Sequence, residues 1–174
     1  MRKTVIGVMG GSQADSHTLE LAWRLGSLIA ANGWVLLSGG RPTGVMQASV
    51  AGAREQGGLC VGVLFDEDRD GAAAGLDIVI PTGMGAGRNI INVLASDVVV
   101  ACRGNGGTLS EIALALRFGR PVVLLDFDPG QAFLTAAAPE GRAQGWAHAA
   151  GPDQAVALVK RYLDELGREA IPIP

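Results

Sequence analysis

The 174-residue sequence is poor in charged residues and in aromatic rings. Charged residues make up 18% of it, and 17 Asp and Glu against 14 Lys and Arg leave a net charge of −3. A chain of this composition has no broad basic surface for nucleic acid, and an aromatic content of 5% argues against stacking platforms for single strands. We therefore expect no nucleic-acid partner.

Long hydrophobic runs and metal-ligand patterns are also missing. No apolar run approaches the roughly 18 residues of a membrane span, and the apolar segment after the basic start is too short for a secretory signal. Cys60 and Cys102 stand alone in apolar runs, and His17 and His148 lack metal-ligand spacing. The sequence predicts a cytoplasmic protein with no membrane contact, no required cofactor and no metal site.

Short runs rich in β-branched residues alternate with segments of helical spacing. The predicted strands are Thr4–Val8, Trp34–Leu37, Cys60–Leu64, Ile78–Ile80, Asp97–Cys102 and Val122–Leu125. Their consecutive apolar positions are typical of parallel strands covered on both faces. With helices between them, and a last helix at about Asp153–Gly167, the alternation predicts an α/β fold. We expect one domain over residues 1–174, a doubly wound Rossmann-like domain with a mainly parallel sheet.

The segment from Asp126 to Gly151 does not follow this alternation. It contains Pro, Gly and Ala without clear period, and only a short helix around Gln131–Ala138 is expected. The segment is interpreted as irregular, serving either as a lid or as packing.

Glycine is abundant, with 26 of 174 positions, and it gathers after predicted strands. In a parallel sheet these loops line the ligand crevice, where their N–H groups and the helix N-termini favour an anion. The pattern is neither a dinucleotide fingerprint nor a Walker loop, and glycines there also serve tight turns. The sequence predicts a small phosphorylated ligand. The candidate binding residues are Gly11, Ser12, Gly39, Gly40, Arg41, Thr43, Gly44, Arg103, Gly104, Asn105, Gly106, Gly107 and Thr108.

Two segments resemble signatures of the LOG family, which includes cytokinin-activating nucleoside 5′-monophosphate phosphoribohydrolases. Residues 39–46, with Ala51–Gly52–Ala53, resemble its GGGxxGLM…GA stretch, and residues 103–111 resemble its PGGxGTxxE signature. The resemblance covers most of residues 4 to 125. It implies that Arg88 and Glu111 are catalytic, with Glu111 facing the substrate ribose, and that the protein forms a homodimer or higher homo-oligomer.

The sequence departs from these signatures at three positions. Arg41 and Asn105 stand where the family has glycine, and Arg103 stands where it has proline. The pattern is similar to a short bacterial branch that also contains molybdenum-cofactor carrier proteins. Two functions therefore remain open: hydrolysis of the N-glycosidic bond of a nucleoside monophosphate, or non-catalytic carriage of the molybdenum cofactor.

Local patterns offer a structural alternative for several candidates. Thr108–Leu109–Ser110–Glu111 is a Thr-x-x-Glu capping box, which predicts that Glu111 turns back to the helix start. Arg88 begins a predicted helix, an unfavourable place for a cation unless an anion or a carboxylate such as Glu111 lies nearby. Arg41 and Arg103 are either phosphate ligands or solvated loop arginines, and Asp66–Asp70 is interpreted as a solvated charged loop.

Overall fold

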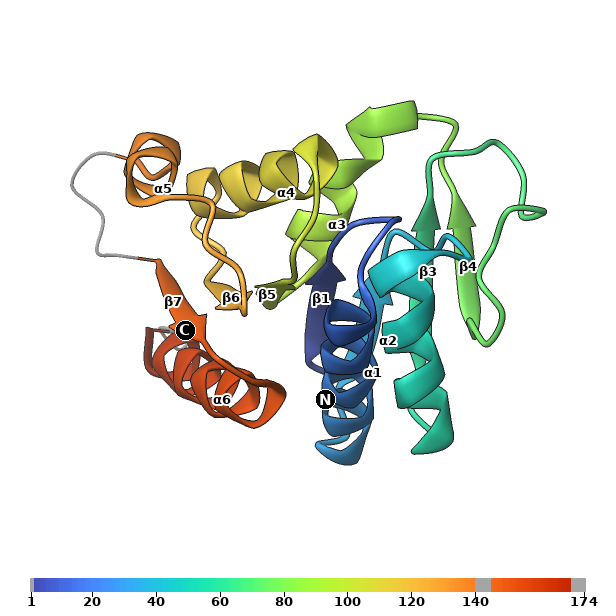
Figure 1. Cartoon of the computed structure of the whole chain (residues 1–174), viewed down its shortest axis with the longest axis horizontal. Helices are drawn as coiled ribbons and strands as arrows, with labels where there is room; N and C mark the ends of the chain where they lie inside the picture. Colours follow the sequence, from blue (N-terminus) through green and yellow to red (C-terminus); the bar gives the residue numbers. More distant parts are fainter. Residues whose placement is uncertain (1, 140–144, 170–174) are drawn as a thin grey trace, which may run out of the picture.

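The computed structural model describes residues 2–139 and 145–169, in which strands and helices alternate (Figure 1). The strands are β1 (Val5–Met9), β2 (Val35–Ser38), β3 (Cys60–Leu64), β4 (Ile78–Pro81), β5 (Val98–Ala101), β6 (Val122–Leu125) and β7 (Trp146–Ala149). The helices are α1 (Ser16–Ala31), α2 (Gly44–Glu55), a 3-10 turn η1 (Gly85–Arg88), α3 (Asn89–Ala95), α4 (Gly106–Arg117), α5 (Gln131–Ala137) and α6 (Pro152–Glu169).

The seven strands form one sheet in the order β4-β3-β2-β1-β5-β6-β7, and every neighbouring pair is parallel. The chain moves outward from β1 to β4 on one side and then returns to place β5 on the other side of β1. The register sets Gly7 beside Leu37 of β2 and Val99 of β5. Strand order therefore reverses at β1 and β5, which is where ligands bind in sheets of this kind.

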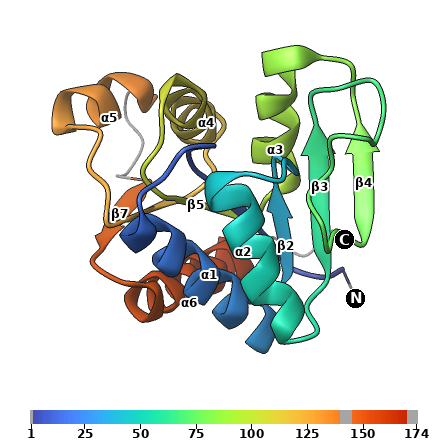
Figure 2. The same cartoon turned by 45° about the vertical axis from the view of Figure 1, so that its right-hand side comes forward.

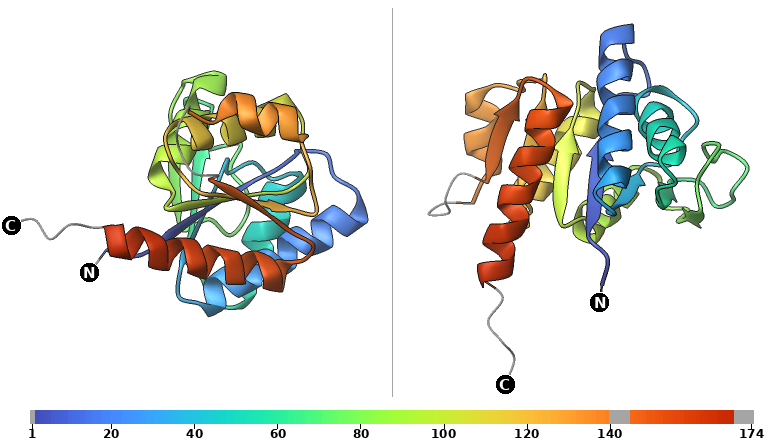
Figure 3. Two further views of the ribbon diagram at one scale, coloured as in Figure 1. Left: turned by 90° about the vertical axis from the view of Figure 1, so that its left-hand side faces the viewer. Right: turned by 90° about the horizontal axis from the view of Figure 1, so that it is seen from below.

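Helices cover both faces of the sheet, as the end-on view in Figure 3 shows. On one face, α1, α2 and α6 bury residues such as Val8, Leu25 and Tyr162 in one apolar cluster. On the other face, α3, α4 and α5 pack with residues such as Val99 and Ile112 in a second cluster. Within the described ranges, no helix combines the length and apolar character needed to span a membrane. The predicted doubly wound, mainly parallel α/β fold is confirmed.

Two local predictions about the strands were wrong. Strand β7 lies inside the segment predicted to be irregular; it adds to the sheet beside β6, and Trp146 is 7% exposed. Strand β4 was expected to be covered on both faces, but Ile78 is 46% and Ile80 42% exposed. Figure 2 shows the reason, since β4 forms the outer edge of the sheet beside β3. The short helix expected near Gln131–Ala138 is present as α5.

Candidate functional site

A cavity of about 480 Å³ opens where the strand order reverses, at the carboxyl ends of β1, β2, β3 and β5. Its wall contains the loop after β1, the loop between β2 and α2, the first residue after β3, the start of α3 and the first turns of α4. The predicted glycine loops therefore meet at one place because parallel strands all end at the same edge. The volume is in the range of pockets for small ligands, about 300–1,000 Å³.

The N-terminus of α4 forms one wall of this cavity. Asn105 is the N-cap residue and makes no side-chain capping bond, and Gly107 and Thr108 follow it along the wall. The first amides of a helix have no intrahelical acceptor, and the helix dipole adds positive potential there. A Cβ built on Gly106 or Gly107 would meet nothing within 4 Å, so glycine leaves open space beside these donors. This wall has the chemistry of an anion site.

Glu111 does not cap α4, and the predicted capping box was wrong. The helix begins at Gly106, which places Thr108 in the first turn and Glu111 beyond it. The Glu111 carboxylate accepts a hydrogen bond from Asn92 Nδ2 at 2.8 Å, and its side chain is only 8% exposed. Burial raises the pKa of Glu111, against the opposing effects of the Asn92 hydrogen bond and the Arg88 charge. Glu111 is therefore a buried carboxylate at the cavity wall.

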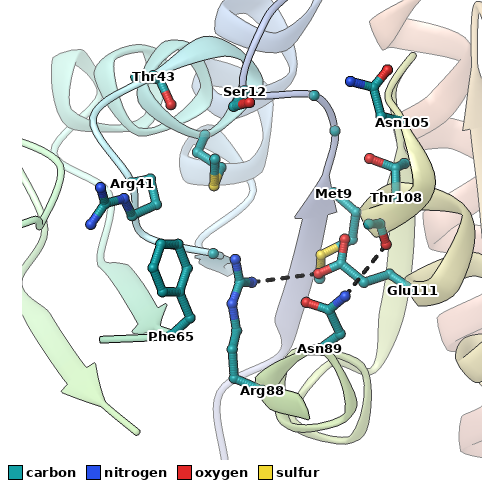
Figure 4. Close-up of a pocket in the computed structure, with 15 residues that line it drawn as sticks. Met9, Ser12, Arg41, Thr43, Phe65, Arg88, Asn89, Asn105, Thr108 and Glu111 are labelled. Carbon is teal, nitrogen blue, oxygen red and sulfur yellow. Dashed lines mark hydrogen bonds and ion pairs between the residues drawn. The ribbon is translucent and has the colours of Figure 1, made fainter. Parts of the chain in front are cut away.

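Arg88, the last residue of η1, extends into the cavity toward Gly39, which follows β2 (Figure 4). Its Nη1 lies 3.6 Å from Glu111 Oε1, and a Cβ on Gly39 would come within 2.5 Å of the guanidinium. Buried atoms Nε and Nη1 find no hydrogen-bond acceptor among the described residues. Burial lowers the pKa of Arg88. The negative charge of Glu111 opposes this shift, and the positive charge of Arg41 adds to it. Arginine nevertheless stays charged in proteins, so Arg88 supplies a buried cation with unsatisfied donors.

Arg41 and Phe65 lie on the side of the cavity opposite Asn105 and Thr108 (Figure 4). Arg41 Nη1 donates to Asp66 Oδ2 at 2.7 Å, and the guanidinium carbon sits 4.8 Å from the centroid of the Phe65 ring. The Asp66 side chain is 27% exposed, so the charged segment predicted to be a solvated loop is anchored at its first residue. Arg41 thus combines an ion pair with a cation–π contact.

Most of the predicted candidates lie at the cavity. Those that line it are Gly11, Ser12, Gly39, Arg41, Thr43, Arg88, Asn105, Gly107, Thr108 and Glu111. Those that do not line it are Gly40, Gly44, Arg103, Gly104 and Gly106. The Arg103 residue is exposed and makes no side-chain contact with the cavity, although its carbonyl accepts from the Gly11 amide at 3.1 Å.

Two of the glycines outside the lining are needed for close packing of the loops. Gly44 has a φ of 55°, and a Cβ there would collide with the backbone of Gly11 and Ser12. A Cβ on Gly104 would collide with the Thr108 hydroxyl and come within 2.8 Å of the Gly11 amide nitrogen. These glycines hold the loops after β1, β2 and β5 together and so shape the cavity without facing it.

The cavity also contains residues that the sequence analysis missed. The missed lining residues are Met9, Gly10, Met46, Phe65 and Asn89. Asn92 does not line the cavity but donates a hydrogen bond to Glu111, which does. Two signals could have found some of them. Phe65 directly follows a strand that ends at the ligand edge, and Asn92 lies four residues after Arg88, which puts both on one face of a helix.

Comparison with known proteins gives the chain a family. Residues 3–156, which make up most of the sequence, match the model of the SLOG cluster4 family. The chain belongs to the SLOG cluster4 family. This membership confirms the resemblance drawn from the two glycine signatures, and it agrees with the position of the cavity at their meeting point.

Two solved structures that are similar to this SLOG protein are of molybdenum-cofactor proteins. The molybdenum cofactor binding protein from Rippkaea orientalis is 44% identical, with a TM-score of 0.86, covering 94% of this chain and 99% of that one. The molybdenum cofactor carrier protein from Chlamydomonas reinhardtii is 40% identical, with a TM-score of 0.84 and the same coverage. The cytokinin riboside 5′-monophosphate phosphoribohydrolase of Mycobacterium tuberculosis is 30% identical over 138 residues, 71% of this chain and 70% of that protein.

Proposed function

We propose that this SLOG protein binds the molybdenum cofactor and holds it through its phosphate group. The observation that carries the proposal is the cavity at the strand reversal, in which the uncapped start of α4 and the unsatisfied Arg88 guanidinium offer donors for an anion. The similarity to two molybdenum-cofactor proteins, over 94% of the chain in both cases, supports this choice of ligand.

The phosphate is assigned to the α4 wall. The amides at Gly107 and Thr108 and the Thr108 hydroxyl, with Ser12 across the cavity, provide short donors that a phosphate monoester can share. Gly107 supports this assignment because it has no side chain in the space that the phosphate would fill. Arg88 adds a fixed positive charge, and its buried donors would gain acceptors that they otherwise lack.

Carriage requires a ligand that is held and protected without being cleaved. The two cysteines do not line the cavity, and burial raises the pKa of Cys60 to about 11 and that of Cys102 to about 12. Neither thiol is therefore placed to replace the cofactor's own sulfur ligands. Binding through the phosphate and the ring system leaves the metal end of the cofactor as it is.

The proposal is tested by mixing the purified protein with isolated molybdenum cofactor. Native mass spectrometry should detect the bound cofactor, and acid oxidation of the complex should release a fluorescent pterin in stoichiometric amount. The variant Gly107→Leu, which places a side chain where the phosphate is assigned, should lose this binding. Absence of the pterin from the wild-type complex would count against the proposal.

Hydrolysis of a nucleoside 5′-monophosphate is a second candidate. It is favoured by one observation, the Glu111 carboxylate 3.6 Å from Arg88 at the cavity wall. A carboxylate there can stabilise an oxocarbenium-like state or accept a proton from the attacking water. Release of free base and ribose 5-phosphate from AMP, and its loss in Glu111→Gln, would support this candidate, whereas no turnover across a nucleotide panel would reject it.

Self-association and a cytoplasmic location are proposed alongside this function. Leu94 of α3 is an apolar side chain that is 44% exposed, which supports a homodimer or higher homo-oligomer. Sedimentation of the wild type and of Leu94→Glu should give different masses if this helix contacts a second copy.

A further inference from the structure

Glu111 is the single group, among the described residues that line the cavity, whose charge can change near neutral pH. The other ionisable side chains of this lining are Arg41 and Arg88, and arginine stays protonated in proteins. The remaining lining residues are Gly, Ser, Thr, Asn, Met and Phe, none of which titrates in this range. A proton that the described wall gains or loses near neutral pH therefore belongs to Glu111.

Two neighbours favour the ionised form of Glu111. Asn92 Nδ2, from α3, donates to Glu111 Oε1 at 2.8 Å. Arg88 Nη1, from η1, lies 3.6 Å from the same oxygen, which makes an ion pair too long for a hydrogen bond (Figure 4). Burial opposes both effects and raises the pKa of Glu111. Farther away, Arg41 and Asp66 act on the charge of Arg88 in opposite directions. The ionised form therefore depends on one amide N–H and on the charge of Arg88.

The Asn92 side chain can pair with either protonation state of Glu111. It is fully buried, and its Oδ1 has no hydrogen-bond partner in the part of the chain that the structure describes. A half-turn of the amide brings Oδ1 to the place of Nδ2, where it accepts from a protonated carboxyl group. One end of the amide is unpaired in both orientations, so the turn costs no net hydrogen bond. The backbone stays in place, since Ser96 Oγ donates to the Asn92 carbonyl at 2.7 Å.

A phosphate bound in the cavity shifts this balance toward the neutral acid. It supplies acceptors to the unpaired Arg88 donors, and its negative charge offsets the positive charge that Glu111 faces. It also lies close to Glu111, because Thr108 and Glu111 are three residues apart on one face of α4. Both effects disfavour a buried carboxylate. The proton comes from solvent and joins a carboxylate oxygen, and the amide of Asn92 turns to accept from the new O–H.

We infer that the cavity takes up a proton together with the phosphate group, and that Asn92 is the positioning residue that lets Glu111 hold this proton. The inference rests on the proposed phosphate site and adds a control of how tightly that site holds its ligand. Because binding and proton uptake are linked, the affinity for phosphate falls as the pH rises, by at most about tenfold per pH unit for one proton. The protein therefore holds its ligand more tightly at lower pH and releases it more readily at higher pH.

The test uses ribose 5-phosphate as the probe and the full chain as the protein. Calorimetry in buffers of different ionisation enthalpy counts the protons exchanged between about pH 7 and about pH 9, where the probe is already a dianion because its second pKa is about 6. Wild type should take up protons on binding, to at most one per ligand, and its affinity should fall across this range. Glu111→Gln should bind the probe without proton uptake and with an affinity that does not change with pH.

The role of Asn92 is tested by Asn92→Leu and by the smaller Asn92→Ala, with thermal unfolding as the check on folding. Without the amide N–H, Glu111 is protonated before the probe binds, so less proton uptake should occur and the fall in affinity should move to higher pH. A purely structural role would instead weaken binding equally at every pH and would overturn the assignment of Asn92. Ser96→Ala is the matched control, because it removes a neighbouring buried hydrogen bond of α3 but keeps the amide, and it should retain the wild-type profile.

The failure of this inference differs from the failure of the phosphate site. If wild type binds ribose 5-phosphate without proton uptake, or Glu111→Gln takes up as many protons as wild type, the proton coupling is wrong and the phosphate site stands. If wild type does not bind ribose 5-phosphate at any pH of the series, the phosphate site itself is wrong.

Discussion

Replacing Glu111 with Gln removes one buried negative charge and keeps the size of the side chain. The amide oxygen can still accept the hydrogen bond from Asn92, so the wall of the cavity should stay in place. Thr108 and Glu111 are three residues apart on one helix, which puts them on the same face, about 6 Å apart. At about 7 Å and an effective dielectric constant of about 20, the carboxylate repels a bound phosphate charge by about 2 kcal/mol.

Glu111→Gln should therefore tighten the binding of ribose 5-phosphate by up to about 30-fold at pH 8. Among the described residues, Glu111 is the only carboxylate within 4 Å of the Arg88 guanidinium. Its loss leaves the Arg88 charge free to attract the phosphate, which also tightens binding. Because burial raises the pKa of Glu111, the wild-type carboxyl takes up a proton as the pH falls, and the two proteins should converge at lower pH. Isothermal titration calorimetry of both proteins between about pH 5 and about pH 8, with thermal unfolding as a check on folding, measures this difference.

The opposite result would refute the electrostatic reasoning. If Glu111→Gln weakens ribose 5-phosphate binding tenfold or more at pH 8 while folding normally, the carboxylate contacts the ligand as a hydrogen-bond acceptor. That outcome would favour the role that the LOG resemblance implies for Glu111, facing the ribose.

Three further predictions concern the same cavity. The free energy of unfolding should fall as the pH rises above the ordinary Glu pKa of 4.5, because the folded state retains a proton on Glu111 that the unfolded chain has released; urea titrations should show this decline in wild type and not in Glu111→Gln. Gly107→Ala should fold with equal or slightly greater stability, by up to about 1 kcal/mol, and bind phosphate more weakly, whereas Gly104→Ala should lose stability because its Cβ has no room beside Thr108. Arg88→Met should weaken ribose 5-phosphate binding at least tenfold, while Arg54→Met, which breaks an exposed ion pair with Asp77 away from the cavity, should leave it unchanged, as calorimetry would record.

The order of elements was largely readable from the sequence. Six strands were predicted close to their observed bounds because buried parallel strands are apolar at consecutive positions. Strand β7 was missed because its sequence, Trp146–Ala149, includes alanine and histidine and lies among glycines and prolines. It becomes a strand by pairing with β6, a long-range contact that local composition does not encode.

The cavity was predictable at the level of loops and less so at the level of side chains. The glycine-rich ends of the strands located it, since parallel topology brings them to one edge. The capping-box prediction for Glu111 was wrong because Gly106 and Gly107 already belong to the helix, which shifts Thr108 into its first turn. The pair Arg41–Asp66 joins residues that are 25 positions apart on different loops, and no sequence spacing predicts such a contact.

The fate of a ligand in this cavity tests most directly whether the protein holds its ligand or cleaves it. Purified protein is given isolated molybdenum cofactor in one sample and AMP in another, and native mass spectrometry follows each over hours. We predict a stable complex that contains intact cofactor, and AMP that is recovered uncleaved. Free adenine and ribose 5-phosphate in the second sample, with no cofactor retained in the first, would contradict it.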